Sequence, residues 1–113
     1  MKPHDEDCIF CRIASGAIPS RKVAENDHAI AFHDIAPKAP VHILVLPKRH
    51  VPDILGLDSA LMGECLSMIQ TIARDMSLDK KGFRVITNCG AEAGQTVMHV
   101  HFHIIAGRML GFE

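Results

Sequence analysis

Apolar positions recur along the chain with two different spacings, and each spacing predicts a different kind of element. Between residues 99 and 104 polar and apolar residues alternate, as they do on a strand with one buried face, and a strand is expected over residues 97–106. Apart from His42, residues 41–46 are apolar and rich in β-branched side chains up to Pro47, which is typical of a buried central strand. Further strands are expected at residues 22–25, 29–34 and 83–88.

One long helix is expected after Asp58, which is a suitable N-cap residue. Its apolar stripe has three- and four-residue steps and consists of Leu61, Cys65, Met68, Ile69, Ile72 and Met76. A short helix is expected over residues 8–15, before Gly16. Together these elements predict an α+β fold with about five antiparallel strands, one long helix and one short helix. The length favours a single domain over residues 1–113.

Charge and composition narrow the classes of partner. Twelve Lys and Arg residues against thirteen Asp and Glu residues, with no basic stripe, disfavour nucleic-acid binding. No apolar run approaches the roughly 18 residues of a membrane span, and the polar N-terminus lacks the pattern of a secretory leader. We therefore expect no membrane partner and a cytoplasmic location. Four cysteines in a reducing compartment are expected to be free, buried or metal-bound.

Three histidines, His99, His101 and His103, alternate with apolar residues and so share one face of the expected strand. A solvated surface strand is disfavoured, because the opposite face is apolar. A metal site is one functional interpretation, since neutral imidazole is a common zinc ligand. Nucleophilic and acid–base chemistry on a phosphoryl group is the other. The alternation alone leaves these two open.

A family resemblance favours the second interpretation. Residues 94–105, Gly-Gln-Thr-Val-Met-His-Val-His-Phe-His-Ile-Ile, resemble the signature of the histidine triad (HIT) family of nucleotide hydrolases and transferases. Residues 8–13, 31–35 and 39–50 are similar to further family blocks in the same order. The resemblance implies the HIT-like fold and a homodimer. Residues 106–112 look most like the Hint branch of purine nucleoside phosphoramidases, although the usual Trp-Pro-Pro-Gly ending is missing.

The resemblance also implies a role for each site residue. His101 would attack the α-phosphorus of a purine nucleotide, with its ring oriented by the main-chain carbonyl of His99. His42 and His103 would donate hydrogen bonds to the phosphate oxygens, and the Thr96 hydroxyl would assist the leaving group. Asp34 would hold the ribose hydroxyls. The complete set of implied substrate-binding residues is Phe10, Ile13, Ile18, Asp34, Ile35, Asn88, Gly94, Gln95 and Val97.

Cys8 and Cys11 have metal-ligand spacing, which is weak evidence by itself because free thiols at this spacing are also common. By resemblance to bacterial HIT proteins, His50 and His99 would complete a two-Cys, two-His site for structural zinc. No metal would then be required for the chemistry.

Several functions compete at this stage. The resemblance favours a hydrolase that cleaves nucleoside 5′-phosphoramidates, of the AMP-amine or AMP-lysine type, through a nucleotidyl intermediate on His101. A dinucleoside polyphosphate hydrolase of the same family is one alternative. Another is a metalloenzyme in which the three strand histidines hold one catalytic ion. A nucleotide-binding regulatory module with little turnover is the last.

Overall fold

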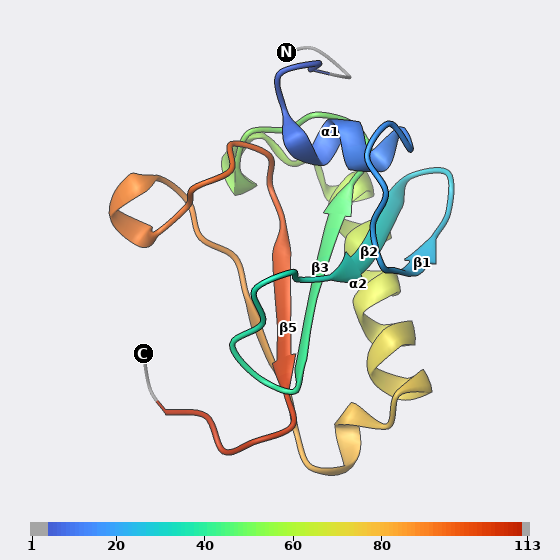
Figure 1. Cartoon of the computed structure of the whole chain (residues 1–113), viewed down its shortest axis with the longest axis vertical. Helices are drawn as coiled ribbons and strands as arrows, with labels where there is room; N and C mark the ends of the chain where they lie inside the picture. The colour runs from blue at the N-terminus through green and yellow to red at the C-terminus, as the bar shows by residue number, and fades with distance from the viewer. Residues whose placement is uncertain (1–4, 112–113) are drawn as a thin grey trace.

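Five antiparallel strands form one sheet in the order β1-β2-β3-β5-β4 (Figure 1). The computed structural model describes residues 5–111. The strands are β1 Lys22–Glu25, β2 Ala29–His33, β3 Val41–Pro47, β4 Arg84–Ile86 and β5 Phe102–Ala106. The expected α+β fold is confirmed, and the apolar run before Pro47 is the central strand.

Two α-helices accompany the sheet, α1 Ile9–Ala14 and α2 Ser59–Asp75. The Asp58 side chain accepts a 2.7 Å hydrogen bond from the Leu61 amide, so the expected N-cap is confirmed. Met76 is the C-cap residue and is 40% exposed, so it does not continue the buried stripe. Three short 3-10 turns, η1 Ile54–Gly56, η2 Leu78–Lys80 and η3 Ala91–Ala93, lie in the connections. Within residues 5–111 no helix is both long enough and apolar enough to cross a bilayer.

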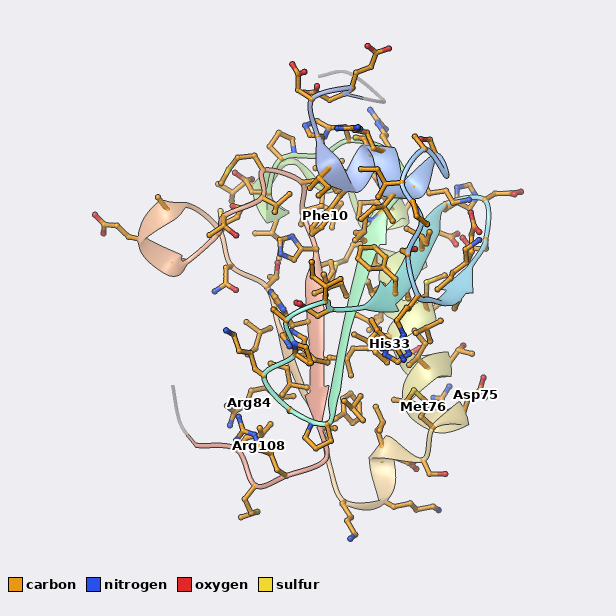
Figure 2. The ribbon with its side chains drawn as sticks, viewed as in Figure 1. Phe10, His33, Asp75, Met76, Arg84 and Arg108 are labelled. Atoms are coloured by element: carbon orange, nitrogen blue, oxygen red, sulfur yellow. The ribbon has the colours of Figure 1, made fainter. Side chains whose placement is uncertain are left out.

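The two faces of the sheet are covered differently. Alternate residues of the strands, including Ile43 on β3 and Ile104 on β5, form the larger core with α2. On the opposite face Phe10 of α1 packs with side chains that include Phe32 and Leu44 (Figure 2). Because side chains alternate along a strand, His42 and His103 lie on the face that α1 covers only at one end.

The expected strand over residues 97–106 is shorter than the alternation predicted, since β5 begins only at Phe102. The antiparallel register would place Val100 opposite Pro47, which has no amide hydrogen to donate. Val100 donates its own amide hydrogen to Val51 instead, at 2.6 Å. His99 and His101 therefore lie in an irregular segment before β5. The strand expected over residues 83–88 is likewise reduced to Arg84–Ile86.

Candidate functional site

Two hydrogen bonds and one aromatic contact hold His101 in place. Its Nδ1 lies 2.7 Å from the main-chain oxygen of His99, so Nδ1 carries the proton and donates it. The lone pair then resides on Nε2. Phe10 packs edge-on against the imidazole with ring centroids 5.0 Å apart. The hydroxyl of Thr87 donates to the His101 main-chain oxygen at 2.8 Å. This neutral, oriented ring has one free nucleophilic nitrogen.

A hydrogen-bonded chain joins His42 on β3 to His103 on β5. The Lys38 amide donates to Nδ1 of His42 at 3.0 Å, so the proton of a neutral His42 is on Nε2. That Nε2 lies 2.9 Å from Nδ1 of His103 and donates to it. The remaining proton of His103 must then be on its Nε2, which is left as an N–H donor. Asp34 is close to this chain, with Oδ2 3.4 Å from Nε2 of His42.

The environment keeps these imidazoles neutral at pH 7. Burial is the main cause that lowers the pKa of His42 and of His101. Burial, followed by the neighbouring His101 and His42, lowers the pKa of His103 to about 4. The Asp34 carboxylate opposes all three shifts but does not reverse them. A neutral imidazole is the form that can act as a nucleophile.

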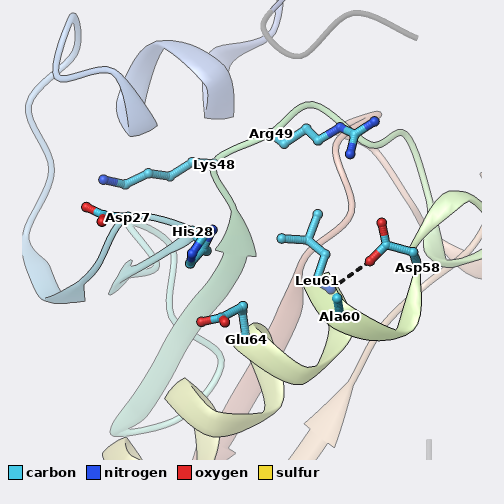
Figure 3. A pocket seen from close by; sticks show the side chains of 8 residues that line it. All are labelled: Asp27, His28, Lys48, Arg49, Asp58, Ala60, Leu61 and Glu64. Carbon is cyan, nitrogen blue, oxygen red and sulfur yellow. Dashed lines mark hydrogen bonds between the residues drawn. The ribbon is translucent and has the colours of Figure 1, made fainter.

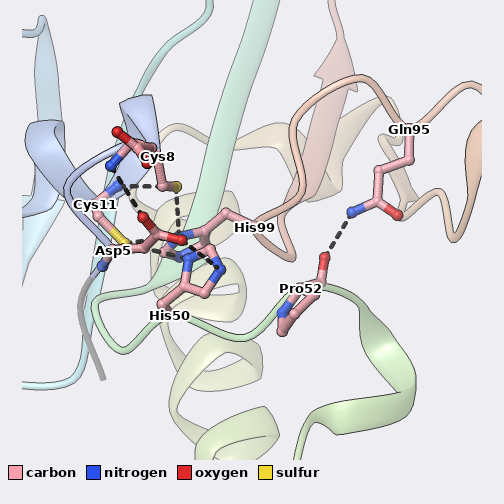
Figure 4. Close-up of polar contacts among 8 residues, drawn as sticks. Asp5, Cys8, Cys11, His50, Pro52, Gln95 and His99 are labelled. Atoms are coloured by element: carbon pink, nitrogen blue, oxygen red, sulfur yellow. Dashed lines mark hydrogen bonds and ion pairs between the residues drawn. The ribbon is translucent and has the colours of Figure 1, made fainter. Parts of the chain in front are cut away.

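A second cluster lies beside the start of α1 and contains Cys8, Cys11, His50 and His99 (Figure 4). One donor atom from each residue lies within 4.8 Å of all the others. Nδ1 of His99 is 3.3 Å from Sγ of Cys8 and 3.5 Å from Sγ of Cys11, and Nδ1 of His50 is 3.3 Å from Sγ of Cys11. Two sulfur and two imidazole donors are a suitable set for tetrahedral zinc.

The surroundings of this cluster also fit a metal. Nε2 of His99 donates to the main-chain oxygen of Pro47 at 2.7 Å, which leaves Nδ1 unprotonated toward the two sulfurs. Nε2 of His50 is 4.0 Å from a carboxylate oxygen of Asp5. The amide of Asp5 donates to Sγ of Cys11, and the amide of Cys11 donates to Sγ of Cys8, each at 3.3 Å. Such hydrogen bonds stabilise thiolate ligands and orient imidazole ligands.

Donor atoms of Asp34, His42 and His103 also lie within 4.8 Å of one another. Their hydrogen bonds indicate a different role, because a metal on Nε2 of neutral His42 would leave Nδ1 protonated against the Lys38 amide. The alternative in which His99, His101 and His103 hold one ion does not fit this geometry. The ring of His99 belongs to the cysteine cluster, away from the chain that joins His42 and His103.

The apolar residues expected around the base have different surroundings. Phe10 is buried among the apolar side chains between α1 and the sheet. Ile13 and Val97 are partly buried and pack against the same apolar side chains. Ile13 and Ile18 line a hollow between α1 and β1. The side chain of Ile35 is fully exposed, so it does not close an apolar slot in this chain.

The loop that carries the expected substrate-binding residues Asn88, Gly94 and Gln95 is organised by its own hydrogen bonds. The buried side chain of Gln95 accepts from the Gly90 amide at 2.9 Å and donates to the Pro52 oxygen at 2.7 Å (Figure 4). Asn88 donates to the Ala93 oxygen. Gly94 adopts φ +90°, with the Asn88 amide nitrogen at 4.0 Å from the position of a Cβ. Exposed Thr96 lines a hollow beside Cys8, and none of these contacts brings it to His101.

Sequence reasoning did not identify Lys38, Pro47 or Thr87 as parts of the site. Lys38 and Pro47 act through main-chain atoms, and Thr87 acts on a main-chain atom, so no side-chain pattern could have revealed them.

A separate hollow of mixed charge lies between the β1–β2 turn and the start of α2 (Figure 3). It is lined by Asp27, His28, Lys48, Arg49, Asp58, Ala60, Leu61 and Glu64, none of which is an expected site residue.

Comparison with known proteins identifies the family. The HIT domain matches residues 15–110, so the chain belongs to the HIT domain family. A histidine triad protein from Clostridium difficile is 45% identical with a TM-score of 0.91, covering 97% of this chain and 98% of that one. A HIT family hydrolase from Legionella pneumophila Philadelphia 1 is 36% identical with a TM-score of 0.89, covering 93% and 96%. A histidine triad nucleotide-binding protein from Candida albicans is 32% identical with a TM-score of 0.83, covering 94% and 82%.

Proposed function

We propose that this protein is a Hint-like hydrolase that cleaves purine nucleoside 5′-phosphoramidates through a nucleotidyl intermediate on His101. The observation that carries the proposal is the 2.7 Å contact between Nδ1 of His101 and the His99 carbonyl, which leaves Nε2 as a free nucleophile. The similar Legionella protein is described as a hydrolase and the Candida protein as nucleotide-binding, and both descriptions agree with this chemistry.

The reaction proceeds in two displacements at the α-phosphorus. Nε2 of His101 forms a bond to phosphorus while the bond from phosphorus to the leaving amine breaks. The amine nitrogen keeps that electron pair and takes a proton from the Thr96 hydroxyl through intervening water, because Thr96 does not contact His101 directly, and the attacking water later returns a proton to Thr96. Water then attacks phosphorus, the electron pair of the N–P bond returns to Nε2, and the nucleoside monophosphate is released. The net reaction consumes one water and yields the monophosphate and the free amine.

The surrounding groups stabilise the charges that develop. Once Nε2 is bonded to phosphorus, the His101 ring becomes cationic, and the His99 carbonyl stabilises it through Nδ1–H. Nε2–H of His103 donates to a phosphate oxygen. Both ring nitrogens of His42 are engaged, one by Lys38 and one by His103. We therefore assign His42 the role of fixing the tautomer of His103 rather than a direct phosphate contact.

The nucleoside is held at the α1 end of the same face. Phe10 contacts the nucleophile ring, and Ile13 and Ile18 line the adjoining hollow that takes the base. Asp34 offers an acceptor for the ribose hydroxyls. Gly94 and Asn88 lie together in the loop before β5 and contact the phosphate. Gln95 holds that loop in shape.

Zinc at Cys8, Cys11, His50 and His99 is part of the proposal, because the donor set and its hydrogen bonds fit this ion. These four residues would supply all the ligands of a tetrahedral ion, which would link the start of α1 to the sheet and leave no position for a catalytic water. We further propose a homodimer in the cytoplasm. Partly exposed Phe83 and Val85 at the β4 edge support a homodimer interface, and four unpaired cysteines support a reducing compartment.

The test is incubation with an adenosine 5′-phosphoramidate, with intact-mass detection of an adenylated protein. Wild-type protein and the His28→Asn control, altered at an exposed histidine outside the site, are expected to release AMP and to carry the adduct on His101. His101→Asn is expected to bind AMP and to lose nearly all turnover. Turnover without an adduct, or unchanged turnover in His101→Asn, contradicts the proposal. Faster cleavage of a dinucleoside polyphosphate than of the phosphoramidate would change the assigned substrate.

A further inference from the structure

We infer that His99 couples the metal cluster to the nucleophile, so that occupation of the cluster sets the orientation of His101. The ring of His99 lies in the cluster, and its main-chain oxygen accepts the Nδ1 proton of His101. One residue therefore belongs to both sites. The inference rests on the proposed nucleophilic role of His101 and adds a positional control to it.

The first link is the backbone of the segment before β5. This segment lies outside the sheet, so its main chain is not held by a strand ladder. The His99 ring is completely buried and is fixed by Nδ1 contacts to two sulfurs and by the Nε2 hydrogen bond to Pro47. A metal joined to Nδ1 would lock this ring, and with it the carbonyl that orients His101.

The second link is Phe10. It lies on α1 between Cys8 and Cys11, and its ring packs edge-on against both His99, at 6.1 Å, and His101, at 5.0 Å. The helix has only six residues, fewer than an isolated helix needs for stability. Two metal ligands at its first turn would fix its position. The cluster therefore also places the aromatic wall that confines the nucleophile.

Loss of the metal should loosen both links while the sheet persists. The larger core between the sheet and α2 contains no residue of the cluster. Without the ion, only the contacts to the two sulfurs and to Pro47 hold the His99 ring, so we expect the His99 carbonyl and Phe10 to restrain His101 less and both tautomers of its ring to become accessible. Removing groups that orient a reacting residue typically lowers activity by about 10- to 100-fold. The same loss is expected in the rate at which His101 is nucleotidylated.

The experiment compares zinc-loaded wild-type protein with Cys11→Ser, and uses Cys89→Ser, an exposed cysteine outside the cluster, as the matched control. Long-range ¹H–¹⁵N correlation of the His101 ring at fixed pH reports its tautomer without any turnover. Intact mass reports the rate of adduct formation, and far-UV circular dichroism reports the fold. The wild-type and control proteins are expected to show a single Nδ1–H tautomer. Cys11→Ser is expected to show a tautomer mixture and about 10- to 100-fold slower adduct formation.

Chelation of the wild-type protein followed by zinc readdition covers the case in which Cys11→Ser does not fold. Reversible loss of the single tautomer supports the coupling. A zinc-free protein that keeps the single tautomer and the full adduct rate overturns it and leaves the metal a purely local anchor. If the loaded wild-type protein forms no adduct but its tautomer still depends on zinc, the proposed function fails while the coupling stands.

Discussion

Replacement of Gly107 by alanine should destabilise the protein at the point where the two histidine-bearing strands meet. Gly107 follows β5 with φ +99°, and an added Cβ would lie 2.8 Å from Cβ and 3.1 Å from Cγ of Pro40. A side chain at such a φ costs about 1–3 kcal/mol. Overpacking against the rigid proline ring costs a further 1–3 kcal/mol, roughly. Together these costs predict a loss of about 2–6 kcal/mol in the free energy of unfolding.

Two other glycines separate the backbone cost from the clash. Gly82 has φ +106° but no atom within 4 Å of an added Cβ, so Gly82→Ala measures the backbone cost alone, about 1–3 kcal/mol. Gly63 lies inside α2 with open space around it. Gly63→Ala should therefore stabilise the protein by roughly 0.5–1 kcal/mol.

The assay is urea unfolding followed by circular dichroism, with linear extrapolation and equal zinc in every sample. Gly107→Ala should lose more stability than Gly82→Ala by about the overpacking cost. It should also lower the rate of the proposed phosphoramidase reaction, because Pro40 precedes the strand of His42 and Gly107 follows the strand of His103. Equal losses in Gly82→Ala and Gly107→Ala would show that Pro40 yields, and the steric reasoning would be refuted.

Two further predictions concern titratable groups. With its pKa lowered to about 4, His103 stays neutral while the unfolded chain takes up a proton below about pH 6.5, so stability should fall as the pH is lowered from 6.5 to 4. An NMR titration should place the His103 midpoint near 4 and not near 6.5, and His103→Gln should flatten the dependence of stability on pH. Burial raises the pKa of Cys65 to about 12, whereas Cys89 is exposed. A thiol reagent on the zinc-loaded protein should therefore label Cys89 quickly and Cys65 only on unfolding, as peptide mass mapping will show; early Cys65 labelling would contradict its burial.

The order of elements could be predicted because it depends on local patterns. The apolar run before Pro47 gave the central strand, and the stripe after Asp58 gave α2 with its N-cap. Alternation around the three histidines predicted a strand for all of them, but only His103 lies in β5. Alternation does not record whether a partner strand can supply hydrogen bonds, and here Pro47 cannot.

By itself the sequence determined the order of helices and strands, the α+β class and the residue types available for chemistry, because these follow from side-chain period and composition. It also determined the resemblance that pointed to His101, to its orientation by the His99 carbonyl and to His99 in the cysteine cluster. Tertiary structure alone decided where each strand ends and that His42 is joined to His103. It also decided the tautomer of His42, because the Lys38 amide donates to its Nδ1. That partner is a main-chain atom, which every residue carries, so only folding can select it.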